Sequence, residues 1–110
     1  MRTMIRSAAF DEFYDLLPAN AQSKVKYAMN MVAQVKVVNT KLVKKLVDTD
    51  FYEMRISVGS EYRIILFTID HENLVEAEHI LLLNGFLKKS TKDYKREIER
   101  VYIIIKKWTR

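Results

Sequence analysis

Two stretches near the start of the chain carry apolar residues at helical spacing. The apolar positions of the first are Phe10, Phe13, Leu16 and Leu17. Those of the second are Val25, Ala28, Met29, Val32 and Val35. Recurrence every three or four residues predicts amphipathic helices. Pro18 separates the two stretches, and Asn20 is placed to cap the second. Because the link is short, we expect an antiparallel helical hairpin.

The middle of the chain alternates between apolar and polar residues with a period of two. The alternating positions are Tyr52, Met54, Ile56 and Val58, and then Tyr62, Ile64 and Leu66. This period predicts strands, and Gly59-Ser60 marks the turn between them. After a second turn at 71–73, a more apolar run at 74–83 predicts a third strand. Short links between consecutive strands favour an antiparallel meander.

Burial constrains how the first two strands pair. A two-residue loop would set Ile56 opposite Arg63 and place an arginine on the apolar face. A three-residue loop pairs Val58 with Tyr62 and keeps the apolar side chains on one face. Since a slip of one residue turns every side chain to the other face, we expect the second register.

The last segment has the clearest helical pattern. Its apolar stripe is Tyr94, Ile98, Val101, Ile105 and Trp108, and Asp93 is placed to cap it. We expect Tyr94, Tyr102 and Trp108 to belong to the core. The basic stretch 41–46 is a short element of undetermined type. Together these elements predict one α+β domain over residues 1–110, with a helical hairpin packed on an antiparallel sheet of three to four strands and a C-terminal helix.

Composition narrows the class of protein. The chain has 49% hydrophobic and 30% charged residues, with two Gly and one Pro, which is typical of a compact ordered domain. It has no cysteine, which excludes disulfides and thiolate zinc sites. The start lacks the apolar run of a signal peptide, and no apolar stretch is long enough to cross a bilayer. We therefore expect a soluble cytoplasmic protein.

Charge is unevenly placed along the chain. Residues 1–50 hold eight Lys/Arg against five Asp/Glu, residues 51–80 two against six, and residues 81–110 nine against three. The net charges are therefore +3, −4 and +6, which add to the total of +5. A basic C-terminal third suggests a polyanionic partner, since Lys and Arg contacts to phosphate supply most nonspecific affinity for nucleic acids. A solvated basic helix that aids solubility is the alternative.

Three charged residues of the first hairpin share the face opposite its apolar side chains. They are Glu53, Arg55 and Arg63. One interpretation is a structural cluster of ion pairs. The other is an anion site, in which arginine forks bind phosphate oxygens and Glu53 moves a proton. We expect Arg63 to point away from the core, so that alanine there would remove function and leave the fold intact.

A second candidate feature follows the third strand. Phe86 precedes Lys88 and Lys89 at the point where this strand ends. An aromatic residue beside two cations suits a stacked base and a phosphate, although adjacent lysines often only face solvent. The two histidines, His71 and His79, lie in different contexts, and no His/Asp/Glu grouping has the spacing of metal ligands. We expect neither a metal nor a cofactor.

Two motifs in this order resemble the HigB-like branch of the RelE/ParE toxin superfamily. Residues 51–55 (FYEMR) followed by 62–65 (YRII) resemble the strand pair of these toxins. Residues 86–98 (FLKKSTKDYKREI) resemble their signature at the last helix. The helical hairpin and the basic link 41–46 stand in the family's order. The resemblance spans about residues 8–108.

The resemblance implies a RelE-like microbial RNase fold, with two helices on a twisted antiparallel sheet. It implies an mRNA endonuclease that acts on the ribosome without a metal, by attack of a ribose 2′-hydroxyl on the adjacent phosphate. The catalytic residues implied are Glu53, Arg55, Arg63, Lys88 and Lys89. The RNA-binding residues that we add are Lys41, Lys44, Lys45, Phe86 and Lys92. The implied partners are the ribosome, mRNA and a cognate helix-turn-helix antitoxin.

The chain departs from the family pattern at several positions. Phe51 and Glu53 stand where several RelE-type toxins have lysines, Asn84 where many HigB relatives have histidine, and Tyr94 replaces the usual proline. These departures leave the general acid and base open. Two alternative functions remain: a ParE-like inhibitor of DNA gyrase, and a nonenzymatic RNA- or protein-binding module of the same fold. The first has no need of the charged cluster.

Overall fold

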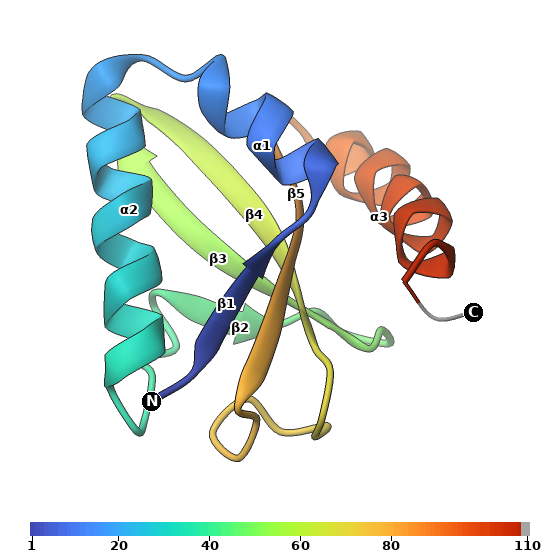
Figure 1. Cartoon of the computed structure of the whole chain (residues 1–110). Helices are drawn as coiled ribbons and strands as arrows, with labels where there is room; N and C mark the ends of the chain where they lie inside the picture. Colours follow the sequence, from blue (N-terminus) through green and yellow to red (C-terminus); the bar gives the residue numbers. More distant parts are fainter. Residues whose placement is uncertain (109–110) are drawn as a thin grey trace.

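A computed structural model gives the structure of the protein, and it describes residues 1–108 (Figure 1). Helices and strands are mixed along the chain. In order they are β1 (Thr3–Arg6), α1 (Ala8–Asp15), α2 (Ala19–Gln34), β2 (Val43–Lys45), β3 (Phe51–Val58), β4 (Ser60–Thr68), β5 (His79–Leu87) and α3 (Thr91–Lys106). Within the described residues, no helix is long and apolar enough to span a membrane.

Two N-terminal helices joined by a short link are present as predicted, but α1 crosses the end of α2 at a wide angle (Figure 1) and Asn20 does not cap α2. Helix α2 starts at Ala19, directly after Pro18, and the side chain of Asn20 accepts a hydrogen bond from the next backbone amide at 2.9 Å. Proline has no amide hydrogen and a fixed φ, so it is well suited to this boundary. Helix α1 is capped by Ser7, whose hydroxyl accepts a hydrogen bond from the amide of Phe10 at 3.1 Å.

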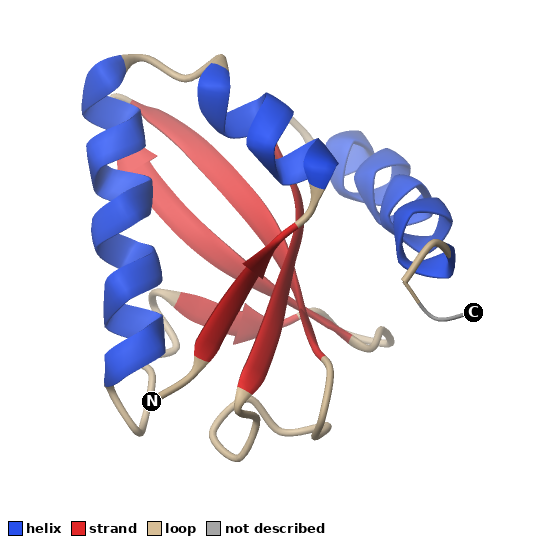
Figure 2. Ribbon diagram, viewed as in Figure 1, coloured by secondary structure: helices blue, strands red, loops and turns tan. Residues whose placement is uncertain are grey.

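The sheet is larger than expected and is mixed. Five strands lie in the order β1-β5-β4-β3-β2, and β1 runs parallel to β5 while the other pairs are antiparallel. Strand β1 was absent from the prediction, and β2 lies within the basic stretch whose type was undetermined. The third predicted strand was misplaced: β5 begins at His79, because residues 74–78 form the connection before it. Figure 2 shows α1 and α2 on one side of the curved sheet and α3 on the other.

The predicted register of the β3–β4 hairpin is wrong by two residues. Ile56 lies opposite Tyr62, and Val58 lies opposite Ser60. The turn is therefore tighter than expected, and Gly59 makes it with φ of 75°, a value that glycine adopts without strain. Because the shift is an even number, every side chain keeps the face that was predicted for it.

Both faces of the sheet carry a core. On one face, Phe10 of α1 and Val25 of α2 pack against strand residues such as Met54 and Ile64. On the other, Val101 of α3 packs against Phe51 and Ile65 among others. Helix α3 therefore covers part of the face that holds the charged residues of the hairpin.

Helix α3 differs from its prediction at both ends. Its N-cap is Ser90, and Asp93 sits three residues later in a capping box, where it accepts hydrogen bonds from the backbone amides before the helix. Tyr102 and Trp108, which were expected in the core, are 44% and 49% exposed. Tyr102 lies at the edge of the apolar stripe, where its ring packs edge-on against Phe51 of β3 with ring centres 5.1 Å apart, and Trp108 lies beyond the end of the helix.

Candidate functional site

Two arginines face each other across the β3–β4 hairpin. Arg55 and Arg63 are direct cross-strand partners, and Glu53, two residues before Arg55, shares their face. The carboxylate of Glu53 contacts both arginines, at 2.9 Å from Nε of Arg55 and 4.0 Å from Nε of Arg63. Like charges directly opposite each other destabilise a sheet. The facing pair of Arg55 and Arg63 therefore concentrates positive charge at a position where it does not favour pairing of the strands.

The three residues differ in burial. Glu53 is 3% and Arg63 is 6% exposed, whereas the side chain of Arg55 is 38% exposed. Arg63 does lie on the face opposite the first core, but that face has a second core under α3. The expectation that alanine at this position leaves the fold intact is therefore wrong. Replacing Arg63 by alanine would remove a buried side chain as well as a charge.

Arg63 is held by four neighbours. Its Nε donates a hydrogen bond to the hydroxyl of Tyr94 at 2.8 Å, and its Nη1 donates to the backbone oxygen of Tyr62 at 2.9 Å and to Glu61 at 3.3 Å. Burial opposes its charge, but the contacts with Tyr94, Glu61 and Glu53 outweigh burial and raise the pKa of Arg63. The guanidinium is fixed in place and permanently charged.

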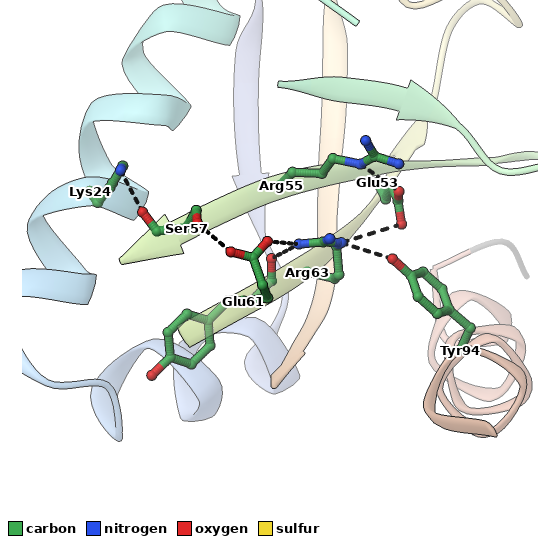
Figure 3. A network of polar contacts seen from close by, with 8 residues as sticks. Lys24, Glu53, Arg55, Ser57, Glu61, Arg63 and Tyr94 are labelled. Atoms are coloured by element: carbon green, nitrogen blue, oxygen red, sulfur yellow. Dashed lines mark hydrogen bonds and ion pairs between the residues drawn. The ribbon is translucent and has the colours of Figure 1, made fainter. Parts of the chain in front are cut away.

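The ring of Tyr94 packs against the core under α3, as predicted, but its hydroxyl contacts the charged cluster, which was not predicted. Tyr94 stands on the first turn of α3, and its hydroxyl lies beside Arg63 and Glu53 (Figure 3). Its ring packs edge-on against Phe86, with ring centres 5.4 Å apart. Burial and then the Glu53 carboxylate raise the pKa of Tyr94, so the phenol stays protonated. A tyrosine within an apolar helical stripe gives no sequence signal of this contact.

A chain of polar contacts extends the site toward α2. Lys24 of α2 donates to the backbone oxygen of Ser57, the hydroxyl of Ser57 donates to Glu61, and Glu61 contacts Arg63 (Figure 3). The hydrogen bond from Ser57 and the contact with Arg63 lower the pKa of Glu61. Neither Lys24 nor Glu61 was a predicted site residue, since only the fold brings them together.

The predicted lysines fall into different places. Lys44 pairs with Glu53 and therefore lies on the face of the site. Lys45 lies on the other face, with its amino group 5.5 Å from the centre of the Tyr52 ring. The amino group of Lys88 lies 5.8 Å from the ring centre of Tyr94, next to the arginines.

The remaining candidates lie at the margin. Lys41, Lys89 and Lys92 are exposed, and the contacts of the described residues do not join their side chains to the cluster. Phe86 is only 8% exposed, and its ring packs on Tyr94. In this arrangement it offers no free face to a base.

Two other features lie apart from the cluster. A hollow of about 560 Å³ is lined by Lys45, Asp50 and residues 67–72 and includes none of the arginines. The fold also brings Asp70, Glu78 and His79 within 4.8 Å of one another, a grouping that the spacing did not predict. The Asp70 carboxylate accepts hydrogen bonds from the backbone amides of Glu78 and His79, so it serves to close the β4–β5 connection.

The fold is that of known toxins. The structure is similar to RelE in the intact RelBE toxin–antitoxin complex of E. coli, with a TM-score of 0.63 and 14% identity over 82% of this chain and 100% of that one. It is also similar to a double arginine-to-alanine mutant of E. coli RelE in the free state, with a TM-score of 0.62 and 13% identity over 90% of this chain and 96% of that one.

An archaeal structure gives the same result. The RelB–RelE antitoxin–toxin complex of Methanococcus jannaschii matches with a TM-score of 0.57 and 22% identity, over 82% of this chain and 96% of that one. No curated protein sequence matches this chain. Residues 12–106 match the family described as Phage derived protein Gp49-like (DUF891). With this match over most of its length, the chain belongs to the Gp49-like family, and it has the fold of the RelE toxins.

Proposed function

We propose that this chain is the toxin of a type II toxin–antitoxin pair, of the HigB-like branch, and that it cleaves messenger RNA on the ribosome. The observation that carries the proposal is the facing pair Arg55 and Arg63 with Glu53 between them. Two guanidinium groups on adjacent strands suit the oxygens of one phosphate group. The carboxylate beside them is placed to exchange a proton.

The proposed reaction is attack by a ribose 2′-hydroxyl on the neighbouring phosphorus. Glu53 takes the proton of that hydroxyl as the new O–P bond forms. Arg55 and Arg63 stabilise the negative charge of the pentavalent intermediate. Lys88 or Lys89 gives a proton to the 5′ oxygen as its bond to phosphorus breaks. The products are a 2′,3′-cyclic phosphate and a free 5′-hydroxyl, so no water is consumed and no oxidant is needed.

Positive charge surrounds the accessible side of the cluster. Lys44 and the partly exposed Arg55 lie on one side of Arg63, and Lys88 lies on the other. Cations along a strip of this kind bind successive phosphates of a nucleic acid backbone. The strip of cations supports binding of an RNA substrate. The ribosome as the site of cleavage follows from the resemblance to HigB-like toxins.

The proposed partner is a cognate antitoxin with a helix-turn-helix domain. Two of the similar structures are complexes of RelE with RelB, which supports a neutralising partner for this chain. The net charge of +5 would favour an acidic binding segment in that partner. We place both proteins in the cytoplasm, where the mRNA and ribosomes are.

The test is induced expression in a bacterium, with the 5′ ends of mRNA mapped during growth arrest. Arg55→Gln is the informative variant because the side chain is partly exposed and its loss should leave the fold intact. Arg6→Gln is the matched control: Arg6 is 43% exposed and has one ion pair, at 2.6 Å to Asp11, but lies on β1. We expect new 5′ ends within translated codons for the wild type and the control, and none for Arg55→Gln.

Growth arrest with intact mRNA would contradict the proposal. It would point to a protein target, such as the gyrase of the ParE-like alternative. Absence of arrest with a folded protein would point to a nonenzymatic binding module.

A further inference from the structure

One of the two arginines that the proposed reaction uses is hydrogen-bonded to another side chain of the protein. Nε of Arg63 donates to the hydroxyl of Tyr94 at 2.8 Å. Beside it, Oε2 of Glu53 is buried and accepts no hydrogen bond from the described residues, and its ion pair with Nε of Arg63 is long, at 4.0 Å. A buried carboxylate oxygen without a hydrogen-bond partner is unfavourable. Both facts concern the same small space, where Tyr94, Arg63 and Glu53 meet (Figure 3).

The phenol oxygen stands where a phosphate oxygen would stand. It accepts from the Nε–H of Arg63, which is one of the two positions that a guanidinium uses in a bidentate bond to phosphate. The phenol is neutral, so Nε of Arg63 donates its hydrogen bond to an uncharged oxygen, and the anion near this atom, Oε2 of Glu53, lies farther away at 4.0 Å. A phosphate that replaced it would make a stronger, charge-assisted bond.

We propose that Tyr94 is a positioning residue that closes this site in the free chain: its hydroxyl orients Arg63 and covers Glu53, and a substrate phosphate displaces it on binding. The proposal rests on the proposed function, since the displacing anion is the scissile phosphate. Displacement frees Nε of Arg63 for the phosphate and uncovers Oε2 of Glu53 for the proton of the 2′-hydroxyl.

Tyr94 is attached in a way that allows this exchange. It lies on the first turn of α3, four residues after the end of the exposed segment 88–90. Its ring is half-buried and touches Phe86 on one side, while Lys88 lies over it. Lys88 is also a proposed phosphate ligand, so the arriving phosphate would draw it away from the ring. Rotation of one side chain toward solvent then opens the site while Val101 and the rest of α3 remain packed.

The test compares Tyr94→Phe with the wild type. Phenylalanine keeps the ring against Phe86 and removes only the hydroxyl. Tyr102→Phe is the matched control, because Tyr102 lies on the same helix and is 44% exposed. The probe is inorganic phosphate, followed by NMR of chains carrying ¹³Cζ-labelled tyrosine. Neither probe nor readout requires the ribosome or cleavage.

We expect Tyr94→Phe to bind phosphate about tenfold more tightly than the wild type, since closing a competent site lowers the apparent affinity by the fraction that stays closed. The control should match the wild type. In the wild type, phosphate should shift the Tyr94 signal toward that of an exposed phenol. Equal or weaker binding by Tyr94→Phe would overturn the proposal. So would an unchanged Tyr94 signal on binding, or failure of phosphate to bind any of the chains.

These outcomes are separate from those of the expression test. If phosphate releases Tyr94 but mRNA stays intact in cells, the closing role stands and the nuclease function fails. If mRNA is cut but Tyr94→Phe binds no more tightly, the function stands and the closing role fails.

Discussion

Glu53 should stabilise the fold through its charge, and Glu53→Gln tests this with almost no change in shape. Its side chain is 4% exposed and lies between Arg55 and Arg63. Removing one partner of a buried ion pair costs about 3–5 kcal/mol. Here Arg55 is partly exposed and Arg63 keeps Glu61 and Tyr94, so we expect about 2–3 kcal/mol. For a domain of this size that corresponds to a fall in Tm of about 10–20 °C.

The assay is urea unfolding followed by circular dichroism, with Asp11→Asn as the control. The Arg6–Asp11 pair is shorter, at 2.6 Å, but both side chains are more than 40% exposed. Exposed pairs contribute less than about 1 kcal/mol. Burial rather than distance therefore decides which variant unfolds more easily. Equal losses for the two variants, or an unaffected Glu53→Gln, would refute the reasoning.

A double-mutant cycle sharpens the result. In the Glu53→Gln background the two arginines face each other without the carboxylate between them. Arg55→Gln should then recover part of the lost stability, with a coupling of about 1 kcal/mol. Simple addition of the two losses would show that the cations do not repel each other at this position.

Three further outcomes follow from other contacts. Gly85→Ala should cost about 1–3 kcal/mol in urea unfolding, because a Cβ there would lie 2.3 Å from the ring of Phe13; Phe13→Leu in the same chain should recover part of it. Arg2→Met should speed hydrogen exchange at the end of α2, since Arg2 donates to backbone oxygens there and in the 74–75 loop. Backbone hydrogen bonds from Lys89 and Ser90 lower the pKa of Asp93 below 3.8 in the folded chain, so its contribution is present above about pH 4 and lost as pH falls through that lowered value. The wild type should therefore lose more Tm than Asp93→Asn between about pH 5 and about pH 2.5.

The parts of the fold that sequence predicted are those with local signals. Alternation in β3 and β4 identified the strands and the face of each side chain, but it does not distinguish registers that differ by two residues. Strand β1 is four residues long and pairs in parallel with β5, far along the chain, so it has no local pattern to find.

The same limit explains what was missed in the site. Glu53, Arg55 and Arg63 were placed on one face because alternation decides the face. Their burial was missed because it depends on where α3 docks, which is a tertiary contact. Tyr94 was assigned to the core from its helical spacing, and its ring does pack there; the contact of its hydroxyl with Arg63 was missed because it depends on where α3 docks.

The pairing of β1 with β5 constrains the order in which the strands can pair while the chain is being synthesised. Strand β1 cannot pair until His79–Leu82 have been made, whereas β3 and β4 are adjacent in the chain and can pair as soon as both have emerged. The two arginines can therefore meet before α3, the helix that covers them, has been synthesised. During that interval the arginine pair has its contacts with Glu53 of the same hairpin but lacks the cover of α3.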